Sequence, residues 1–308
     1  MLNFLLDIAP DKSQLLLTIK LAGILREKKQ EVYYTYTSNP AFTPVLYDKG
    51  ISNCVLYPDD FRWLKPDLTL LDCRHAAHAS LYRQLAIDYI FIAMQLPDQK
   101  NIQDKDISIL YLPPTPCLSS GSGPRLETLT KRLQDIKKDK ERNIIVGLLG
   151  KGNKNSKILE DFYRVIKRSS IRNPRYQFIL LTDIPNVYQS SELPDNMELF
   201  RTLNLNTILP LCDLALTDSH SDAWLDCTFA QIPVLKYSPK DMINITPMKL
   251  EQQIEYALQN KTTLTQKAKE LCDFFERKNR EINKIADMLI ERAGRNRYNS
   301  CRLRPHTY

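Results

Sequence analysis

Chemically useful side chains gather in the second half of the chain, in the polar segment 217–222 with the sequence Thr-Asp-Ser-His-Ser-Asp. The segment follows an apolar run and precedes a helical stretch that contains Asp226. The hydroxyls of Ser219 and Ser221 can donate hydrogen bonds to a phosphate, and a protonated His220 can do the same. A strand, a polar turn and a helix start form an anion-binding edge in a parallel sheet. We therefore interpret the segment as a phosphate site; the alternative is a plain helix N-cap made by Ser219 or Ser221.

A second turn carries the glycines that such a site uses. Gly150, Gly152 and Asn153 follow the apolar segment 144–149 and precede a predicted helix. Glycine lets backbone N–H groups approach a diphosphate closely, and the helix start adds a favourable dipole. The turn lacks the Lys-Ser/Thr ending of a P-loop, so it is not a Walker motif. It predicts diphosphate binding, with an ordinary surface turn as the alternative.

Carboxylates at strand ends in the first half are candidates for proton transfer. Asp11 lies in the turn after the first predicted strand, and Asp72 ends a later one. The carboxyl ends of parallel strands meet at one edge of a sheet, so both are expected to face a ligand. Burial raises a carboxyl pKa and would make either group a general base; the alternative is a polar strand end. His75 and His78 have no evident third ligand, so no metal site is predicted.

Strands alternate with helices along the whole chain, which builds parallel sheets covered on both faces. Apolar runs rich in β-branched residues predict strands, and apolar residues at helical spacing predict helices. The predicted strands cover 2–8, 31–37, 54–57, 68–71, 89–94, 107–112, 144–149, 178–182, 197–200, 214–217 and 234–236. The predicted helices cover 15–29, 59–64, 76–85, 126–142, 158–168, 248–258 and 265–292.

A boundary between two domains is visible in the composition. Proline, serine and glycine concentrate in 113–125, as is typical of a linker. We predict an N-terminal domain over 1–120, a linker and basic helix over 121–142, and a C-terminal domain with terminal helices over 143–308.

Composition excludes several classes of protein. No apolar run in the 308 residues reaches the ~18 that a membrane helix needs, and the N-terminus lacks the basic start of a signal peptide. Seven cysteines without metal spacing are expected to be reduced thiols in the cytoplasm. The net charge of +7 accompanies no nucleic-acid-binding motif, so nucleic acid is not an expected partner. The basic C-terminal tail is expected either to be solvated or to contact anionic lipid at a membrane surface. Its arginines are Arg292, Arg295, Arg297, Arg302 and Arg304.

Several motifs together resemble the nucleotide-sugar glycosyltransferases of the UDP-glycosyltransferase type. Leu-Pro-Leu-Cys-Asp-Leu at 209–214, the polar turn 217–222 and Gln-Ile-Pro-Val at 231–234 follow the order of that family's donor segment. Leu-Pro-Asp-Asn-Met-Glu-Leu at 193–199 resembles the strand before it, and Pro-Asp-Leu-Thr-Leu-Leu-Asp at 66–72 resembles a strand of the family's first domain. The resemblance implies an α/β fold of two Rossmann-like parallel-sheet domains facing across a cleft, the GT-B architecture.

The resemblance also implies roles for particular residues. Asp72 matches an active-site carboxylate, Asp226 a ribose-binding acid and Asp241 a sugar-binding acid of the family. The remaining expected donor contacts come from the two polar turns. They are Gly150, Gly152, Asn153, Ser219, His220 and Ser221. The sequence departs from the family's motifs at two places: Gln14 replaces the family's basic histidine, and Ser219-His220 replaces its Gly-Gly pair.

The implied function is transfer of a sugar from a nucleotide donor, UDP-linked by analogy, to an acceptor, with inversion and without metal or cofactor. A lipid-linked acceptor would suit a peripheral contact with the membrane. Two alternatives stay open. One is a non-catalytic glycosyltransferase-like subunit that binds a protein partner, and the other is a nucleotide-sugar hydrolase of the same fold. Gln14 and Ser219-His220 favour the non-catalytic alternative, whereas the glycine turn favours catalysis.

Overall fold

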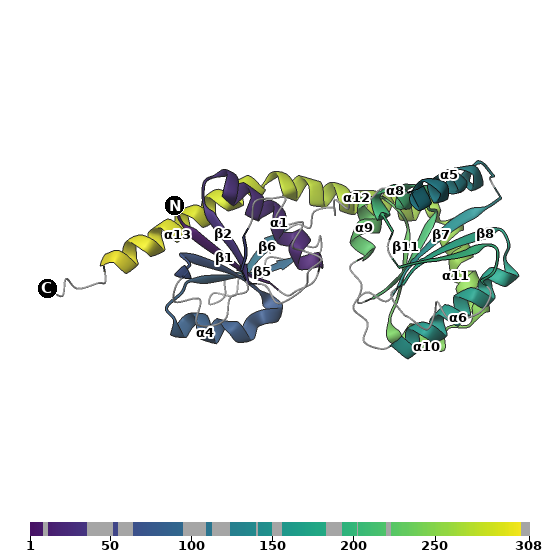
Figure 1. The fold of residues 1–308 in the computed structure, drawn as a ribbon, viewed down its shortest axis with the longest axis horizontal. Helices are drawn as coiled ribbons and strands as arrows, with labels where there is room; N and C mark the ends of the chain where they lie inside the picture. The colour runs from purple at the N-terminus through teal and green to yellow at the C-terminus, as the bar shows by residue number, and fades with distance from the viewer. Residues whose placement is uncertain are drawn as a thin grey trace. The chain divides into compact units, whose positions relative to one another are not determined.

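The computed structural model describes residues 1–8, 12–35, 52–54, 64–94, 109–112, 124–139, 141–149, 156–182, 193–201, 203–219 and 223–302. The chain divides into two compact units, each built on its own parallel sheet (Figure 1). One unit comprises Met1–Thr115 together with Phe274–Tyr308, and the other comprises Pro116–Asp273.

The first unit contains a six-stranded sheet in the order β3-β2-β1-β4-β5-β6, with every pair parallel. The strands are β1 (Asn3–Asp7), β2 (Glu31–Thr35), β3 (Ser52–Cys54), β4 (Leu68–Asp72), β5 (Tyr89–Met94) and β6 (Ile109–Leu112). The chain winds outward from β1 through β2 to β3, and then outward from β4 on the other side. The strand order therefore reverses between β1 and β4, and such a point is where parallel sheets hold ligands.

Helical elements cover the first sheet and pack against it in two apolar cores. They are α1 (Lys12–Glu27), the 3-10 turn η2 (Cys73–His78), α4 (Ala79–Gln84) and α13 (Ile282–Arg302). One core contains residues of α1 and α13, and the other contains residues of α4. The helix α13 supplies one apolar stripe to the first of these cores, at the spacing of one helix face. Its fully buried members are Ile282, Ala286, Leu289 and Ala293. Figure 1 shows α13, in yellow, alongside the purple N-terminal strands of the same unit.

The two units refine the domain bounds expected from the sequence. The predicted C-terminal domain covered 143–308 with terminal helices that could cross to the first domain, and Phe274–Tyr308 belongs to the first unit. The buried residues of this segment form an apolar stripe whichever sheet they pack against, so the sequence pattern alone does not show which sheet the segment covers. The basic helix predicted within 121–142 is α5 (Pro124–Lys138), and its buried Leu133 is part of the second unit's core rather than of a linker.

The second unit contains a five-stranded parallel sheet in the order β11-β10-β7-β8-β9. The strands are β7 (Asn143–Leu148), β8 (Tyr176–Leu181), β9 (Met197–Phe200), β10 (Leu214–Asp218) and β11 (Val234–Tyr237). The helical elements are α5, α6 (Ser156–Arg172), α8 (Leu205–Ile208), η3 (Leu209–Leu211), α9 (Ala223–Phe229), α10 (Pro239–Asn244), α11 (Pro247–Gln259) and α12 (Lys261–Arg280). The order reverses between β7 and β10, which is a second point suited to a ligand.

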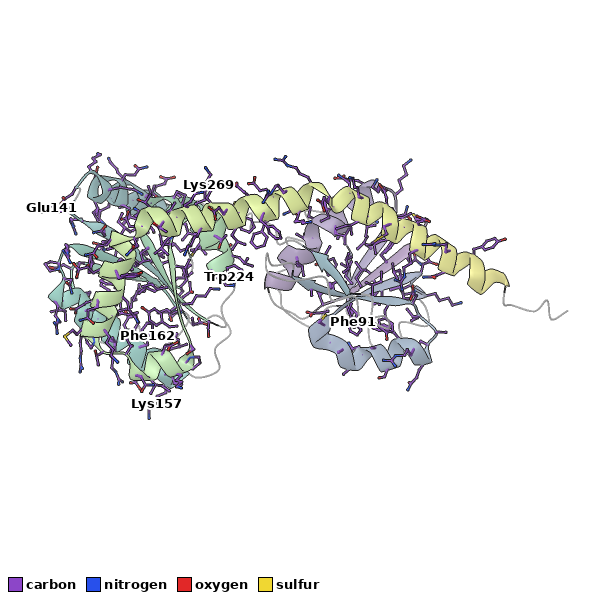
Figure 2. The ribbon with its side chains drawn as sticks, turned by 180° about the vertical axis from the view of Figure 1, so that it is seen from behind. Phe91, Glu141, Lys157, Phe162, Trp224 and Lys269 are labelled. Carbon is purple, nitrogen blue, oxygen red and sulfur yellow. The ribbon has the colours of Figure 1, made fainter. Side chains whose placement is uncertain are left out.

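Two apolar cores cover the two faces of this second sheet. Alternate residues of β7 enter different cores, since Ile145 packs with α6 whereas Ile144 and Val146 pack with α5. Phe162 of α6 is fully buried and its ring lies 4.9 Å from that of Tyr237, while Lys157 of the same helix lies on the outer side (Figure 2). A strand buried on both faces reads as a continuous apolar run, which is why the sequence shows these strands clearly.

The predicted fold class is confirmed: the protein is an α/β protein with two Rossmann-like parallel-sheet domains. The bounds of β5 and β9 equal those expected from the sequence. The predicted helix over 76–85 begins earlier, as the 3-10 turn η2, and the predicted helix over 59–64 lies outside the described residues apart from Leu64. No helix in the described part of the chain is long and apolar enough to cross a membrane.

The basic tail has a structural role that the sequence did not predict. The helix α13 continues through it to Arg302. The Arg292 guanidinium donates to both carboxylate oxygens of Asp88, at 2.8 and 2.9 Å, and Asn296 donates to the same carboxylate at 2.7 Å. Arg297 donates to the backbone carbonyl of Met1. These contacts tie α13 to the strand-start edge of its own sheet.

We expect Arg292→Gln to lower the stability of the first unit by about 1 kcal/mol at neutral pH. Burial by itself raises the pKa of Asp88, but the hydrogen bonds from Arg292 and Asn296 and the Arg292 charge outweigh it, so the pKa is lowered. A lowered folded-state pKa adds stability above the unfolded value of 3.8, and that stability is lost as pH falls through the folded-state value. Both side chains are about one-third exposed, which limits the effect.

The measurement is urea unfolding of wild type and Arg292→Gln across acidic to neutral pH. The difference in unfolding free energy is expected to shrink as Asp88 becomes protonated. A difference that stays constant down to the acid limit would show that the Arg292 contact stabilises through packing alone.

Candidate functional site

The carboxyl ends of β1 and β4 bring two acidic residues to the point where the first sheet reverses its order. Asp7 ends β1 and Asp72 ends β4, and the two strands are hydrogen-bonded neighbours. Their side chains are 2% and 1% exposed. A buried carboxylate needs hydrogen-bond donors or positive charge to offset its lost hydration. The partners of Asp7 therefore indicate what this edge of the sheet is built to do.

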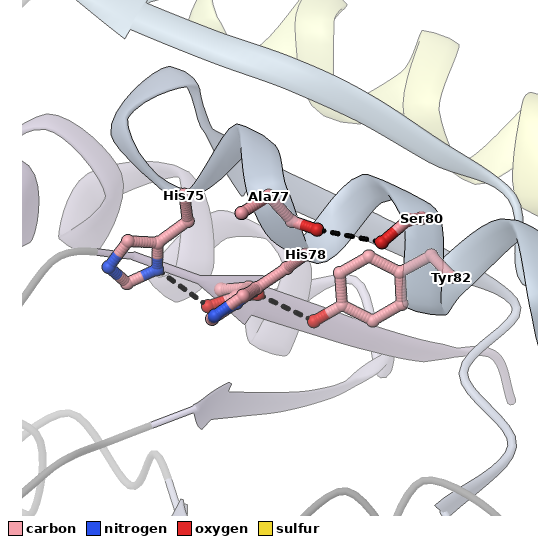
Figure 3. Close-up of polar contacts among 6 residues, drawn as sticks. His75, Ala77, His78, Ser80 and Tyr82 are labelled. Atoms are coloured by element: carbon pink, nitrogen blue, oxygen red, sulfur yellow. Dashed lines mark hydrogen bonds and ion pairs between the residues drawn. The ribbon is translucent and has the colours of Figure 1, made fainter.

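Three side chains from the segment after β4 converge on the Asp7 carboxylate. Figure 3 labels the three, which are His75, His78 and Tyr82. His75 Nδ1 lies 2.9 Å from Oδ1, and His78 Nδ1 lies 2.7 Å from Oδ2. The Tyr82 hydroxyl donates to Oδ2 at 2.7 Å. Burial raises the pKa of Tyr82, and the negative charge of Asp7 and this hydrogen bond raise it further, so the phenol stays a donor. The four residues form one polar cluster, which we call the Asp7 cluster.

The turn η2 explains how two histidines three residues apart reach one carboxylate. His75 has φ −97° and ψ 25°, outside the helical range, and this kink separates η2 into two parts. That backbone region is sparsely populated and is often occupied at active sites. The imidazole rings lie with centroids 4.8 Å apart and tilted by 44°. His75 is a quarter exposed and His78 about half exposed, so both rings combine a buried partner with access to solvent.

The sequence prediction missed this cluster because it found no third partner for the two histidines. Asp7 is that partner, 68 residues before His75 in the chain. One ligand atom from each of Asp7, His75 and His78 lies within 4.8 Å of the others, so the three residues form a set that could hold a metal ion. The only sequence signal was an aspartate that ends an apolar strand beside a strand that leads into the histidine turn.

The thiol beside this cluster is unsuited to act as a nucleophile. Cys73 directly follows Asp72 at the start of η2. Burial raises the pKa of its thiol, and the negative charge of Asp72 raises it further. A thiol with a raised pKa is largely protonated at neutral pH and reacts slowly.

The second reversal point, between β7 and β10, is where the two predicted phosphate turns begin. Gly147 lies in β7 with no room for a side chain, because a Cβ there would collide with the Leu180 side chain on β8. Thr217 and Asp218 end β10 fully buried, and the Ser219 amide donates to the Tyr237 carbonyl at 2.8 Å. The pairing of β10 with β11 therefore extends to Ser219, which is exposed at the start of its turn.

Most of the predicted donor contacts lie outside the described residues. These contacts are Gly150, Gly152, Asn153, His220 and Ser221. Asp11, a predicted catalytic residue, also lies outside the described residues. Both flanks of each turn are described, and the turns leave neighbouring strands at the same sheet edge. The strand order thus brings the starts of the two turns together, as the sequence interpretation requires.

Asp226 lies in the first turn of α9, the helix that follows the second polar turn. It is 7% exposed, which is unusual for an aspartate near a helix start. Trp224 precedes it by two residues, and the Lys236 ammonium lies over the Trp224 ring at 3.9 Å from its centroid. An aromatic ring of α9 and a cation of β11 are therefore in contact.

Asp241, the predicted sugar contact, has a structural role in the capping of α10. Its carboxylate accepts from the Ser238 amide at 2.8 Å and from the Ser238 hydroxyl at 2.5 Å, and the Ser238 oxygen accepts from the Asp241 amide. This reciprocal pair is a capping box. The hydrogen bonds from Ser238 lower the pKa of Asp241, so it is ionised at neutral pH. The side chain is exposed, and a sugar contact stays a prediction.

Comparison with known proteins gives matches at the level of structure only. No protein-family model matches the chain, and no curated protein sequence matches it. The glycotransferase of kitacinnamycin matches with a TM-score of 0.66 at 12% identity, covering 94% of this chain and 98% of that one. The glycosyltransferase SnogD from Streptomyces nogalater matches with a TM-score of 0.62 at 14% identity, covering 95% and 99%.

A third similar structure is the spinosyn rhamnosyltransferase SpnG complexed with thymidine diphosphate. It matches with a TM-score of 0.65 at 11% identity, covering 92% of this chain and all of that one. These similarities extend over nearly the full length of both chains in each comparison. The chain therefore has the GT-B glycosyltransferase fold.

Proposed function

We propose that this protein transfers a sugar from a nucleotide-sugar donor to an acceptor. The observation that carries the proposal is the match to glycosyltransferase structures over more than nine-tenths of the chain, including one complexed with thymidine diphosphate. Fold by itself does not imply function, so the residues at the two reversal points must support it. The second unit would take the nucleotide and the first would take the acceptor, as the sequence resemblance implies.

The donor is proposed to bind at the reversal point between β7 and β10. Backbone N–H groups at Gly150, Gly152 and Asn153 would face the diphosphate, together with the Ser219, His220 and Ser221 side chains. Asp226 would accept hydrogen bonds from the ribose hydroxyls, because one carboxylate can accept two at once. Asp241 is the proposed sugar contact. A uridine diphosphate sugar follows from the resemblance, and a thymidine diphosphate sugar follows from the complexed neighbour.

The reaction is proposed to be a single displacement with inversion. The acceptor oxygen would attack the anomeric carbon on the face opposite the nucleoside diphosphate, whose bond to the sugar breaks. Protein groups that donate hydrogen bonds to the diphosphate would stabilise the leaving group in place of a metal ion. The acceptor must also lose a proton, and the sequence predicted Asp72 or Asp11 for that step.

A second candidate is a non-catalytic subunit that keeps the fold and binds a partner protein. Gln14 favours it, because an amide cannot accept a proton at neutral pH as the family's histidine does. Ser219 and His220 favour it too, since side chains replace a Gly-Gly pair that approaches phosphate closely.

A thermal-shift panel of UDP-, TDP- and GDP-sugars tests the proposal. A ligand that binds only the folded state at ~100 times its Kd stabilises by about 2.7 kcal/mol, which raises the melting temperature by several degrees. We expect the nucleotide sugars of one nucleobase to raise the melting temperature by this amount and free sugars to leave it unchanged. A melting temperature unchanged by every nucleotide sugar would contradict donor binding and favour the partner-binding candidate.

A further inference from the structure

We propose that His75, held by Asp7, is the general base that takes the proton from the acceptor; this rests on the proposed function. In the step, the acceptor O–H bond breaks as its oxygen bonds to the anomeric carbon. The proton goes to His75 Nε2, and the electron pair of the breaking sugar–phosphate bond leaves with the nucleoside diphosphate. Neither Asp72 nor Asp11 is needed for this proton transfer.

The hydrogen bonds of the Asp7 cluster set the state of the imidazole. With Asp7 ionised, the carboxylate only accepts hydrogen bonds, and the ring nitrogen that lies 2.9 Å from Asp7 Oδ1 is then the one that carries the proton. In the neutral ring the lone pair is then on Nε2. Figure 3 shows this second nitrogen of His75 pointing away from the carboxylate. A buried acid that holds one nitrogen and frees the other is the arrangement that prepares histidine for proton transfer.

The same contacts stabilise the product of proton uptake. When His75 takes the acceptor proton it becomes an imidazolium, and its other ring nitrogen lies 2.9 Å from Asp7 Oδ1. Asp7 is 2% exposed, so water screens the pair little. The Tyr82 hydroxyl and His78 hold the other oxygen, Oδ2, at 2.7 Å each, which fixes the carboxylate plane for His75.

Exposure and chemistry favour His75 over the other candidates. Asp72 is 1% exposed at the end of β4, so an acceptor hydroxyl has little access to it. His75 is 25% exposed, which admits an acceptor while limiting water, whereas His78 is 51% exposed. Histidine is also the side chain that most often acts as a general base. His75 lies three residues past the end of β4, at the reversal point of the first sheet.

A metal ion is the competing use of the same three residues. For Asp7, His75 and His78 to bind an ion through the nitrogens that face the carboxylate, both Nδ1 protons would have to leave. Both nitrogens instead lie at hydrogen-bond distance from Asp7. The two uses predict opposite responses to chelators, so one experiment separates them.

The first measurement needs no acceptor. Long-range nitrogen–proton NMR spectra of the full chain labelled in histidine report which ring nitrogen carries the proton. With His75→Gln used to assign the signal, we expect neutral His75 to be protonated on Nδ1. Protonation on Nε2 in the folded protein would overturn the proposal.

The second measurement is the rate of sugar transfer to two acceptors. The donor is the nucleotide sugar that stabilises the wild type. One acceptor is a phenol, and the other is a thiophenol that is already ionised at the assay pH. We expect His75→Gln to lose about 10²–10⁴-fold in rate with the phenol and to stay close to wild type with the thiophenol, which needs no base. His78→Gln is expected to lose less with the phenol, and Ser80→Ala, on the exposed face of α4, is the control for local disturbance.

The outcomes separate this inference from the proposed function. A wild type that binds no nucleotide sugar and transfers nothing ends the proposed function, and this inference with it. A wild type that transfers while His75→Gln matches it on the phenol ends this inference alone. Loss of the thiophenol activity in His75→Gln would assign His75 a structural role. Transfer that stops with EDTA and returns with Zn²⁺ would assign a metal centre instead.

Discussion

Leu289→Ala is expected to lower the free energy of unfolding of the first unit by about 2–5 kcal/mol. Leu289 lies on α13, is fully buried, and packs in the core built by β1, α1 and β4. Removing its branched end loses the transfer free energy of those atoms. It also leaves a cavity, because the surrounding strands and helices relax only partly. The effect would be the largest of the substitutions proposed for stability.

The test must report on the first unit, since a chain with two cores need not unfold in one step. Hydrogen exchange of the β1 and β4 amides, followed by mass spectrometry, measures that unit directly. Met288→Ala is the matched control, because Met288 is the preceding residue of α13 and is 49% exposed. It should change stability by less than about 0.5 kcal/mol. Equal effects of the two substitutions would mean that α13 does not complete the first core.

Asp226→Ala is expected to weaken nucleotide binding by about 1–3 kcal/mol, or roughly 5–150-fold in Kd. Asp226 lies in the first turn of α9, next to the proposed phosphate turn at the end of β10. A carboxylate that accepts two ribose hydroxyl bonds makes charge-assisted contacts, which are stronger than neutral ones. Its removal leaves those hydroxyls without partners in the bound state.

Isothermal titration calorimetry with the nucleotide found by thermal shift measures this change. Asp226→Asn is a second variant that keeps the shape and one acceptor, so it should lose less affinity than alanine. Asp161→Ala, an exposed acid on α6 in the same unit, controls for the loss of one negative charge. Because Asp226 is buried, each variant's melting temperature is recorded too. An affinity unchanged in a folded Asp226→Ala protein would remove Asp226 from the donor site.

Much of the fold follows from local patterns. The run Tyr89–Met94 is apolar and rich in strand-forming residues between polar neighbours, so its bounds are predictable. The change of pattern near 113–125 marks the boundary between the halves, and the second unit begins within it, at Pro116. The polar turns after β7 and β10 were predictable as candidate sites because each follows a buried strand of a parallel sheet, although a helix N-cap or a surface turn has the same pattern.

The Asp7 cluster shows where sequence reasoning stops. In the sequence His75 and His78 had no evident third ligand, and neither Asp7 nor Tyr82 was a candidate partner. No local pattern shows that Asp7 contacts the segment with His75 and Tyr82, because the contacting residues are 68 to 75 positions apart in the chain. They meet only because β4 pairs with β1 rather than with β3, the strand before it in the chain.

The sequence by itself determined that the protein has two halves, that each half is a parallel α/β unit, and which face of each element is apolar. Tertiary structure decided which elements share a core and which side chains meet. Hydrophobic periodicity shows that a helix face is buried but not which sheet it packs against, so the pattern did not show that α13 belongs to the core of the first unit and α5 to a core of the second. Hydrogen bonding is short-ranged and directional, so the contacts of His75 and His78 with Asp7 depend on strand order, which no local pattern encodes.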